Sequence, residues 1–169
     1  MLKIRLEEAR DQAAVRQLNE IAFENASEAA VVDALRTACD NFVSFVADDQ
    51  GALVGHILFT PATLDGSELT GMGLAPMAVS PNQQRRGIGS LLVRHGLEHL
   101  RRAGCPFVIV LGHPEYYPRF GFEPASRYNL RCQWEGVPDA AFMAVVFDQD
   151  ALPSAGGIAR YRGEFDAAM

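Results

Sequence analysis

Residues 74–104 constrain the fold of this chain more than any other stretch. The stretch begins with six apolar residues bounded by turn residues, which predicts a buried strand with one irregularity at Pro76. Residues 90–103 have a helix-forming composition without proline, and the following glycine provides a helix stop. Between these segments lies the polar, glycine-bearing run 81–89. The sequence therefore predicts a strand, a tight loop and a helix in direct succession.

The loop in this succession has the properties of a phosphate-binding site. Gly87 and Gly89 let the backbone approach a ligand without a Cβ in the way. The first N–H groups of the following helix have no intrahelical acceptor, and the positive end of the helix dipole attracts an anion. Arg85 and Arg86 add two permanent positive charges beside that end. We therefore expect the loop to bind phosphate groups.

Two common nucleotide-binding loops do not fit this run. A Walker loop needs Gly-Lys-Ser or Gly-Lys-Thr, and the chain contains neither. The dinucleotide fingerprint needs a third glycine where Leu92 stands, and an acidic residue about twenty positions further on. Glu98 and Glu115 do not fit that distance. A nucleotide-binding regulator is therefore a disfavoured alternative.

Composition and charge narrow the class of protein. The chain has 169 residues, 49% of them hydrophobic and 21% charged, as in a globular protein with one domain. Its formal net charge of −6 argues against nucleic-acid binding. The longest apolar run, residues 140–147, is too short to cross a membrane. Acidic residues stand where a signal peptide needs an apolar run, so we expect a cytoplasmic protein. Three cysteines without metal-type spacing predict reduced thiols and no metal site.

The rest of the sequence predicts a mixed α/β sheet. Alternating and apolar runs predict strands at residues 2–6, 42–47, 53–59, 69–79, 106–111, 130–132 and 142–147. Helical spacing and capping residues predict helices at 11–23, 27–35 and 90–103, with a short one at 115–120. We assign residues 1–150 to one domain. Residues 151–169 are expected to form a C-terminal tail that packs on the same domain through Ile158, Tyr161 and Phe165.

Two motifs in this framework resemble those of the GNAT superfamily of N-acetyltransferases. The acetyl-coenzyme A loop of that family reads Gln or Arg, two variable residues, Gly, one variable residue, then Gly or Ala. The run Gln84-Arg85-Arg86-Gly87-Ile88-Gly89 matches every fixed position. The second family signature, a tyrosine with three residues between it and Gly-Phe, stands here as Tyr117-Pro118-Arg119-Phe120-Gly121-Phe122. With the preceding residues 112–116, this run looks like the bacterial YhbS-like branch.

The resemblance covers residues 2 to about 147 and implies a GNAT-type acyltransferase fold of the α/β (α+β) class. Such a fold has a mixed, mostly antiparallel sheet of about seven strands flanked by helices and splayed at the fourth strand. It also implies acetyl-coenzyme A as cosubstrate, direct attack by an acceptor amine in a ternary complex, no metal, and a monomer or homodimer. The cofactor-binding residues that it implies are Met77, Ala78, Val79, Gln84, Arg85, Arg86, Gly87, Ile88, Gly89 and Ser90. The side chains of Met77 and Val79 are interpreted as core, with only their backbone facing the cofactor.

Tyr117 occupies the family's position for the catalytic acid. A tyrosine hydroxyl holds its proton at neutral pH and can donate it to the departing thiolate. The structural alternative is an aromatic ring packed beside Phe120 and Phe122. Its neighbour Tyr116 is expected to form a wall of the site.

Two departures from the family pattern leave the general base open. Many relatives carry a glutamate base on the fourth strand, where Gly73 stands here, and an asparagine where Val110 stands. The base candidates are therefore Glu24, Glu28, His56, Glu68, His113, Glu115 or a water chain. The missing glutamate also keeps open an alternative function, a catalytically impaired acyl-coenzyme A sensor or interaction module. The acceptor amine, small or peptidic, is not identified by the sequence.

Overall fold

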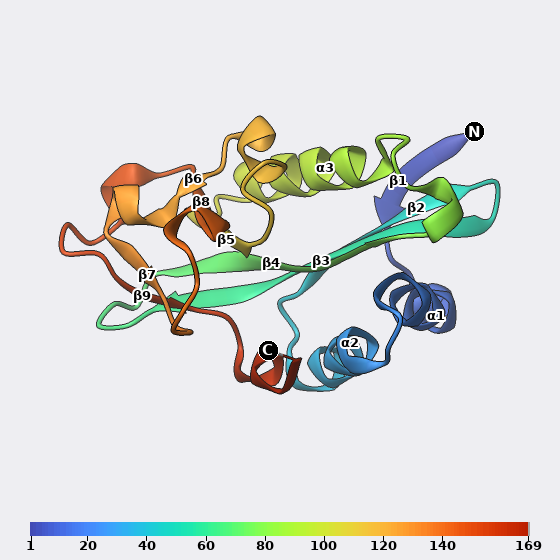
Figure 1. The fold of residues 1–169 in the computed structure, drawn as a ribbon, viewed down its shortest axis with the longest axis horizontal. Coiled ribbons are helices and arrows are strands. Elements are labelled where there is room, and N and C mark those ends of the chain that lie inside the picture. The colour runs from blue at the N-terminus through green and yellow to red at the C-terminus, as the bar shows by residue number, and fades with distance from the viewer. Residues whose placement is uncertain (169) are drawn as a thin grey trace. The chain divides into compact units, whose positions relative to one another are not determined.

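The computed structural model describes residues 1–168 as two compact units. One unit contains residues 1–60, 75–96 and the segment from Gly163, and the other contains residues 61–74 and 97–162. The helices are α1 (Gln12–Phe23), α2 (Ser27–Ala38) and α3 (Ile88–Arg102) (Figure 1). The strands are β1 (Leu2–Leu6), β2 (Val43–Asp49), β3 (Ala52–Leu64), β4 (Thr70–Val79), β5 (Phe107–Leu111), β6 (Glu123–Pro124), β7 (Leu130–Cys132), β8 (Phe142–Val146) and β9 (Gly157–Arg160).

Antiparallel pairing dominates within each unit. In the first unit, β2 pairs antiparallel with β1 and with the first part of β3. In the second unit, β8 lies antiparallel to β5 and β6, and β9 lies antiparallel to the end of β3. The pairings of β4 with β5 and of β7 with β9 are parallel. The predicted fold class, a mixed and mostly antiparallel sheet with flanking helices, is confirmed.

The described residues contain two strands that the sequence did not predict. All seven predicted strands are present, and β6 and β9 raise the number to nine. Both are short, and their partners are distant in sequence, as in the pair Thr63↔Arg160. The partner residues of β9 exist because β3 continues to Leu64, five residues beyond its predicted end at residue 59. The division into a domain of residues 1–150 and a tail of residues 151–169 stays a prediction.

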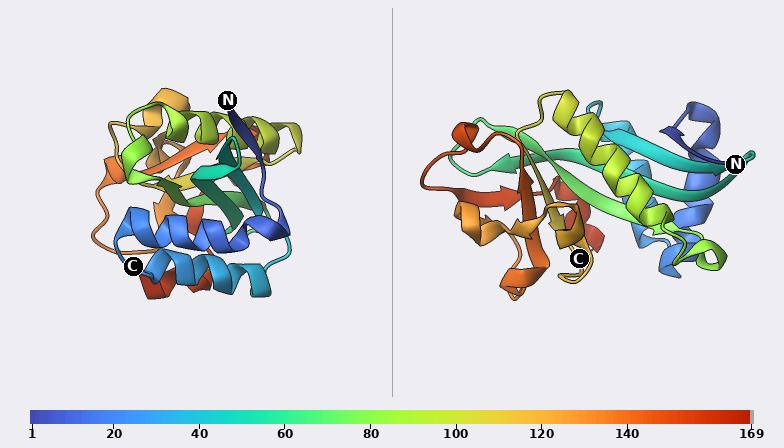
Figure 2. Two further views of the ribbon diagram at one scale, coloured as in Figure 1. Left: turned by 90° about the vertical axis from the view of Figure 1, so that its right-hand side faces the viewer. Right: turned by 90° about the horizontal axis from the view of Figure 1, so that it is seen from above.

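Two faces of β3 carry different helices in the first unit. The Cβ that a substitution would add at Gly55 would lie 2.9 Å from Leu92 Cδ1, so α3 packs closely on this face. The next residue along β3, His56, points to the other face, where it meets Asn19 of α1. α1 and α2 pack side by side below these strands, with α3 above them (Figures 1 and 2). A second glycine, Gly96, lets α3 approach the Phe59 ring. A Cβ added at position 96 would lie only 2.3 Å from Phe59 Cε2.

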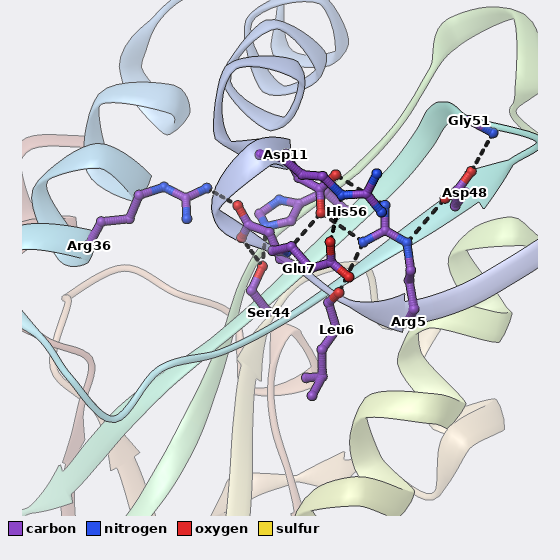
Figure 3. A network of polar contacts seen from close by, with 11 residues as sticks. Arg5, Leu6, Glu7, Asp11, Arg36, Ser44, Asp48, Gly51 and His56 are labelled. Carbon is purple, nitrogen blue, oxygen red and sulfur yellow. Dashed lines mark hydrogen bonds and ion pairs between the residues drawn. The ribbon is translucent and has the colours of Figure 1, made fainter.

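A buried polar network ties α1, α2 and the strands of the first unit together (Figure 3). His56 is fully buried, and Asn19 Nδ2 donates to its Nδ1 at 3.1 Å. His56 Nε2 lies 2.9 Å from Ser44 Oγ, and Ser44 Oγ donates to Glu7 Oε1 at 2.5 Å. Arg36 of α2 closes the network through an ion pair with Glu7. Since Asn19 donates to Nδ1, the neutral imidazole carries its proton on Nε2 and donates it to Ser44.

Burial, together with the positive charge of Arg36, lowers the pKa of His56 to about 3. The unfolded chain protonates this residue near its ordinary pKa of about 6.5. Between these two values the unfolded state therefore binds more protons than the folded state, and stability falls as the pH falls.

We predict that His56→Gln removes much of the pH dependence of stability between pH 6.5 and 4.5. In the wild type, the free energy of unfolding should fall by up to about 1.4 kcal/mol for each pH unit in this window. Urea unfolding at several pH values measures the slope of this free energy against pH. The matched control is His113→Gln, a change of the same kind at an exposed histidine. The burial account of His56 is contradicted if His56→Gln keeps the wild-type slope.

Candidate active site

The predicted phosphate loop joins β4 to α3 within the first unit. A 3-10 turn at Pro81–Gln83 follows β4, and α3 begins at Ile88. Ser80 N donates to Val54 O of β3 at 2.8 Å, which fixes the point where the chain leaves the sheet. Gln84 Nε2 donates to Val79 O at 3.1 Å and folds the loop back onto the end of the strand. The predicted succession of strand, loop and helix is therefore present.

The backbone of the loop takes a left-handed conformation at two positions. Arg85 has a φ of 65° and Gly87 a φ of 82°. An L-residue at such an angle is uncommon, and strained residues of this kind cluster at binding sites. A Cβ on Gly87 would meet no atom within 4 Å, so open space lies beside this glycine. Gly87 O accepts the bond from Leu91 N at 3.0 Å, which starts the helix directly after the loop.

The side chains of the loop divide into a buried anchor and two exposed charges. Ile88 is 5% exposed and packs toward Gly55, so only its backbone N–H faces the helix entrance. Arg85 and Arg86 are exposed, and within residues 1–168 neither forms an ion pair. Arg86 Nη1 donates to Gln83 Oε1 at 3.3 Å, a contact that leaves its charge uncompensated.

Two arginines at the far end of α3 differ from Arg85 and Arg86 because they form ion pairs. Arg101 and Arg102 both bond Glu98 Oε1, at 2.6 Å and 2.8 Å. Hydrogen bonds from these arginines lower the pKa of Glu98 to about 2, so the carboxylate stays charged and offsets their field. Glu98 therefore partly compensates these two arginines, whereas Arg85 and Arg86, in the loop before α3, have no ion-pair partner within residues 1–168.

The end of β4 presents its backbone differently from its start. β4 pairs with β5 at Met72, Gly73 and Leu74. Two residues further on, Pro76 has no N–H for a sheet partner. This pattern agrees with the predicted departure of the fourth strand.

The burial of the last residues of β4 corrects one interpretation from the sequence. Ala78 is 2% exposed and belongs to the core, whereas Met77 and Val79 are only half-buried. The prediction that the side chains of Met77 and Val79 are core is therefore wrong. Alternation along the strand places Ala78 inward, which leaves its neighbours on the more open side.

Tyr117 lies in the second unit, at the start of the 3-10 helix Tyr117–Phe120. Its ring is 8% exposed and packs edge-on against Tyr116, Phe120 and Phe122, with ring centroids 5.1–6.4 Å apart. A Cβ on Gly112 would lie 2.4 Å from Tyr117 Cε2, so this glycine makes room for the ring. Gly112 N itself donates a hydrogen bond to Ala141 O at 2.9 Å. The ring is therefore fixed from several sides.

Burial, with a smaller contribution from Tyr116, raises the pKa of Tyr117 to about 12. The hydroxyl therefore keeps its proton throughout the neutral range. Tyr116 has a different environment, because it is half-buried and the Arg119 guanidinium lies 4.7 Å from its ring centroid. Arg119 Nε also donates to Tyr116 O at 2.9 Å, and the wall role of Tyr116 stays a prediction.

The structure removes one candidate for the general base and marks another. His56 is enclosed in the polar network with both ring nitrogens engaged, so its selection as a base candidate was wrong. Glu28 Oε2 is buried and has no hydrogen-bond partner within the described residues. The four other side-chain candidates, Glu24, Glu68, His113 and Glu115, are exposed.

No sequence motif indicated a site role for Tyr161. Its ring covers Gly73, the position at which many GNAT relatives carry their glutamate, and a Cβ there would lie 2.6 Å from Tyr161 Cε1. Within residues 1–168, no group of three His, Cys, Asp or Glu residues is arranged to hold a metal ion. No helix in this range is long and apolar enough to span a membrane.

The chain is similar to known N-acetyltransferases over most of its length. The acetyltransferase (GNAT) domain family matches residues 3–125. The uncharacterized N-acetyltransferase YhbS of Escherichia coli is 35% identical over 166 residues, which are 96% of this chain and 98% of that protein. The crystal structure of YhbS in complex with coenzyme A matches with a TM-score of 0.89, covering 98% of this chain and 92% of that one.

A second solved structure has the same fold with the acyl donor bound. It is a GNAT family acetyltransferase from Brucella melitensis in complex with acetyl-CoA, with a TM-score of 0.82 and 36% identity. The match covers 98% of this chain and 99% of that one. Fold and loop together define an acyltransferase. More narrowly, the chain belongs to the GNAT family of N-acetyltransferases and resembles its YhbS branch.

We predict that replacing both Arg85 and Arg86 with alanine weakens acetyl-CoA binding by roughly ten- to a hundredfold at low salt. Because the two charges are uncompensated, the wild-type affinity should fall as salt rises, and the double variant should lose most of that dependence. Calorimetric titration at several salt concentrations measures both effects. The matched control is Arg101→Ala with Arg102→Ala, which should bind like the wild type. Equal losses in the two double variants would show that the field is diffuse.

Proposed function

We propose that this protein transfers the acetyl group of acetyl-CoA to a primary amine of a small molecule or peptide by direct attack in a ternary complex. The acyl donor is supported by the two similar proteins solved with coenzyme A and acetyl-CoA. The reaction needs no metal in this proposal. We further propose that it proceeds in the cytoplasm, in a monomer or homodimer.

In this proposal the phosphate loop binds the pyrophosphate of the cofactor. Gly87, Ile88, Gly89 and Ser90 contribute backbone N–H groups at the start of α3, and Gly87 leaves the space that a phosphate group needs. Arg85 and Arg86 add charge-assisted hydrogen bonds. Gln84, through its bond to Val79 O, holds the loop in shape.

The last residues of β4 bind the pantetheine arm and the thioester. Backbone groups of Met77, Ala78 and Val79 have these roles, because a strand that leaves its neighbour keeps polar groups available for a ligand. An N–H group fixed in this way stabilises the oxyanion that forms on the thioester carbonyl.

The chemical step joins the acceptor nitrogen to the acetyl carbon. The amine lone pair attacks the thioester carbonyl and gives a tetrahedral intermediate, which collapses with cleavage of the carbon–sulfur bond. The electron pair of that bond leaves on sulfur, and the Tyr117 hydroxyl supplies the proton that turns the thiolate into coenzyme A. A base or water accepts the proton that the amine loses, and Tyr117 is reprotonated from solvent. The proposal requires the hydroxyl to reach the sulfur of the bound cofactor.

One observation carries this assignment: the Tyr117 hydroxyl is held on a fixed, buried ring whose pKa is raised to about 12. A proton donor must be protonated when the thiolate forms, and burial keeps the Tyr117 hydroxyl protonated in the neutral range. The ring contacts also show that Tyr117 packs against Phe120 and Phe122. The packing role and the acid role are therefore compatible in the same residue.

Glu28 is the base candidate that the structure favours. A buried carboxylate oxygen without a partner is unfavourable, and the ammonium group of an acceptor would supply that partner. The negative charge of Glu28 would also attract a cationic amine before it loses its proton.

The alternative function is an acyl-CoA sensor or interaction module without turnover. The observation that favours it is Gly73, which cannot act as a base at the position that many relatives use. The two functions differ in an assay of coenzyme A release with a panel of amines. A sensor would bind acetyl-CoA in calorimetry and release none with any amine.

We predict that Tyr117→Phe lowers turnover by roughly two to four orders of magnitude, the range typical of one positioned acid. The affinity for acetyl-CoA should change little, because the ring and its packing remain. Steady-state kinetics with any working acceptor measures the first effect, and calorimetry measures the second. Tyr116→Phe, a change of the same size one residue away, should keep turnover near the wild-type value. If Tyr117→Phe retains most of its activity, another group protonates the thiolate.

A further inference from the structure

Tyr161 brings a buried hydroxyl from the C-terminal part of the chain to the end of the β4–β5 pairing. The residue follows β9 directly and is 6% exposed. Its ring stacks on Trp134, with centroids 5.8 Å apart and an angle of 26°. Gln133 Oε1 accepts a bond from Tyr161 N at 2.6 Å. The ring is thus held in place by its own unit, with Gly73 of β4 beneath it.

The hydroxyl bonds backbone groups of both strands where their pairing ends. It donates to Leu74 O of β4 at 3.0 Å, with Ile109 O of β5 at 3.4 Å as a second acceptor. It accepts a bond from Leu111 N of β5 at 3.3 Å. Leu74 is the last β4 residue in the register with β5, opposite Val110. A single hydroxyl therefore satisfies polar groups of two strands at the point where their ladder stops, which an apolar side chain cannot do.

Both contacts lead directly to residues with proposed roles in the reaction. Leu111 precedes Gly112, the residue on which the Tyr117 ring rests. Leu74 precedes residues 75–79, the part of β4 to which the thioester is assigned. Burial raises the pKa of Tyr161 above its ordinary value, and Tyr117 makes a smaller contribution in the same direction.

We propose that Tyr161 is a positioning residue for the acetyl transfer. Its hydroxyl fixes the backbone of Leu111 and Leu74, and so orients Gly112, against which the Tyr117 ring packs, and residues 75–79 of β4. This inference rests on the proposed function and adds a residue to it. It also explains why a glycine stands at position 73, because a larger side chain there would collide with the Tyr161 ring. In this chain a ring from the C-terminal segment occupies the place where many relatives carry a glutamate side chain.

The test is Tyr161→Phe, which keeps the ring and its stacking on Trp134 and removes only the hydroxyl. We expect kcat to fall by roughly tenfold, the rate equivalent of one hydrogen bond, with a much smaller change in KM for acetyl-CoA. Tyr128→Phe, a half-buried tyrosine of the same unit, is the control and should match the wild type. Wild-type kcat in Tyr161→Phe would overturn the proposal.

A double variant separates positioning from a general loss of structure. If Tyr161 acts through Tyr117, adding Tyr161→Phe to Tyr117→Phe should lower kcat much less than it does in the wild type. Independent effects that multiply would overturn this role. Gly73→Ala is a second route to the same displacement, because its Cβ pushes the ring without touching the hydroxyl, and it should reproduce the loss of kcat.

Amide hydrogen exchange gives a readout that does not depend on turnover. Loss of the hydroxyl should speed exchange of Leu111 and its neighbours, while peptides from α1 and α2 remain unchanged. Unchanged protection around Leu111 would overturn the positioning role even if no acceptor is known. The wild type could release no coenzyme A with any amine while Tyr161→Phe still loses this protection. The hydrogen bonds of Tyr161 would then have a structural role only, and both the proposed function and the positioning role would fail.

Discussion

The close packing of α3 on β3 is the contact on which the candidate site depends. Glycines at 55 and 96 remove the two side-chain atoms that would separate the helix from the strand, and the Leu92 and Phe59 side chains fill the space instead. Ile88 is buried in the same interface, so the first turn of the helix cannot shift without breaking the core. The N–H groups of that turn therefore have a fixed place, and the two exposed arginines stand in the loop directly before it. A loop that binds phosphate needs such support, because flexible donors would lose entropy on binding.

The same burial that stabilises the fold also sets its proton chemistry. His56 loses its ability to accept a proton because it lies in the core beside Arg36, and it becomes a neutral link between α1 and the sheet. Tyr117 keeps its proton for the corresponding reason, since its anion would be poorly solvated. The surroundings thus keep His56 neutral, and they keep the Tyr117 hydroxyl protonated, as the proposed acid role requires.

Local signals explain what the sequence predicted well. The strand, loop and helix around Gly87 depend on residues that are adjacent in the chain, and the Tyr117 motif is equally compact, so both could be recognised. The contact of Tyr161 could not be predicted, because its partner Leu74 lies 87 residues away and β9, which Tyr161 follows, pairs with the distant β3. His56 was misinterpreted for the same reason, since Asn19, Ser44 and Glu7 come from different elements. Residues 77 and 79 were assigned to the core because an apolar run does not reveal which face of a strand is covered.

The central claim is that one cofactor molecule engages both the loop before α3 and the Tyr117 hydroxyl. A crystal structure of this protein with coenzyme A tests it most directly. The account predicts the pyrophosphate against the N–H groups of residues 87–90, with Arg85 or Arg86 in contact, and the sulfur within hydrogen-bond reach of Tyr117 Oη. A pyrophosphate bound away from this loop, or a sulfur whose nearest proton donor is another residue, would contradict it.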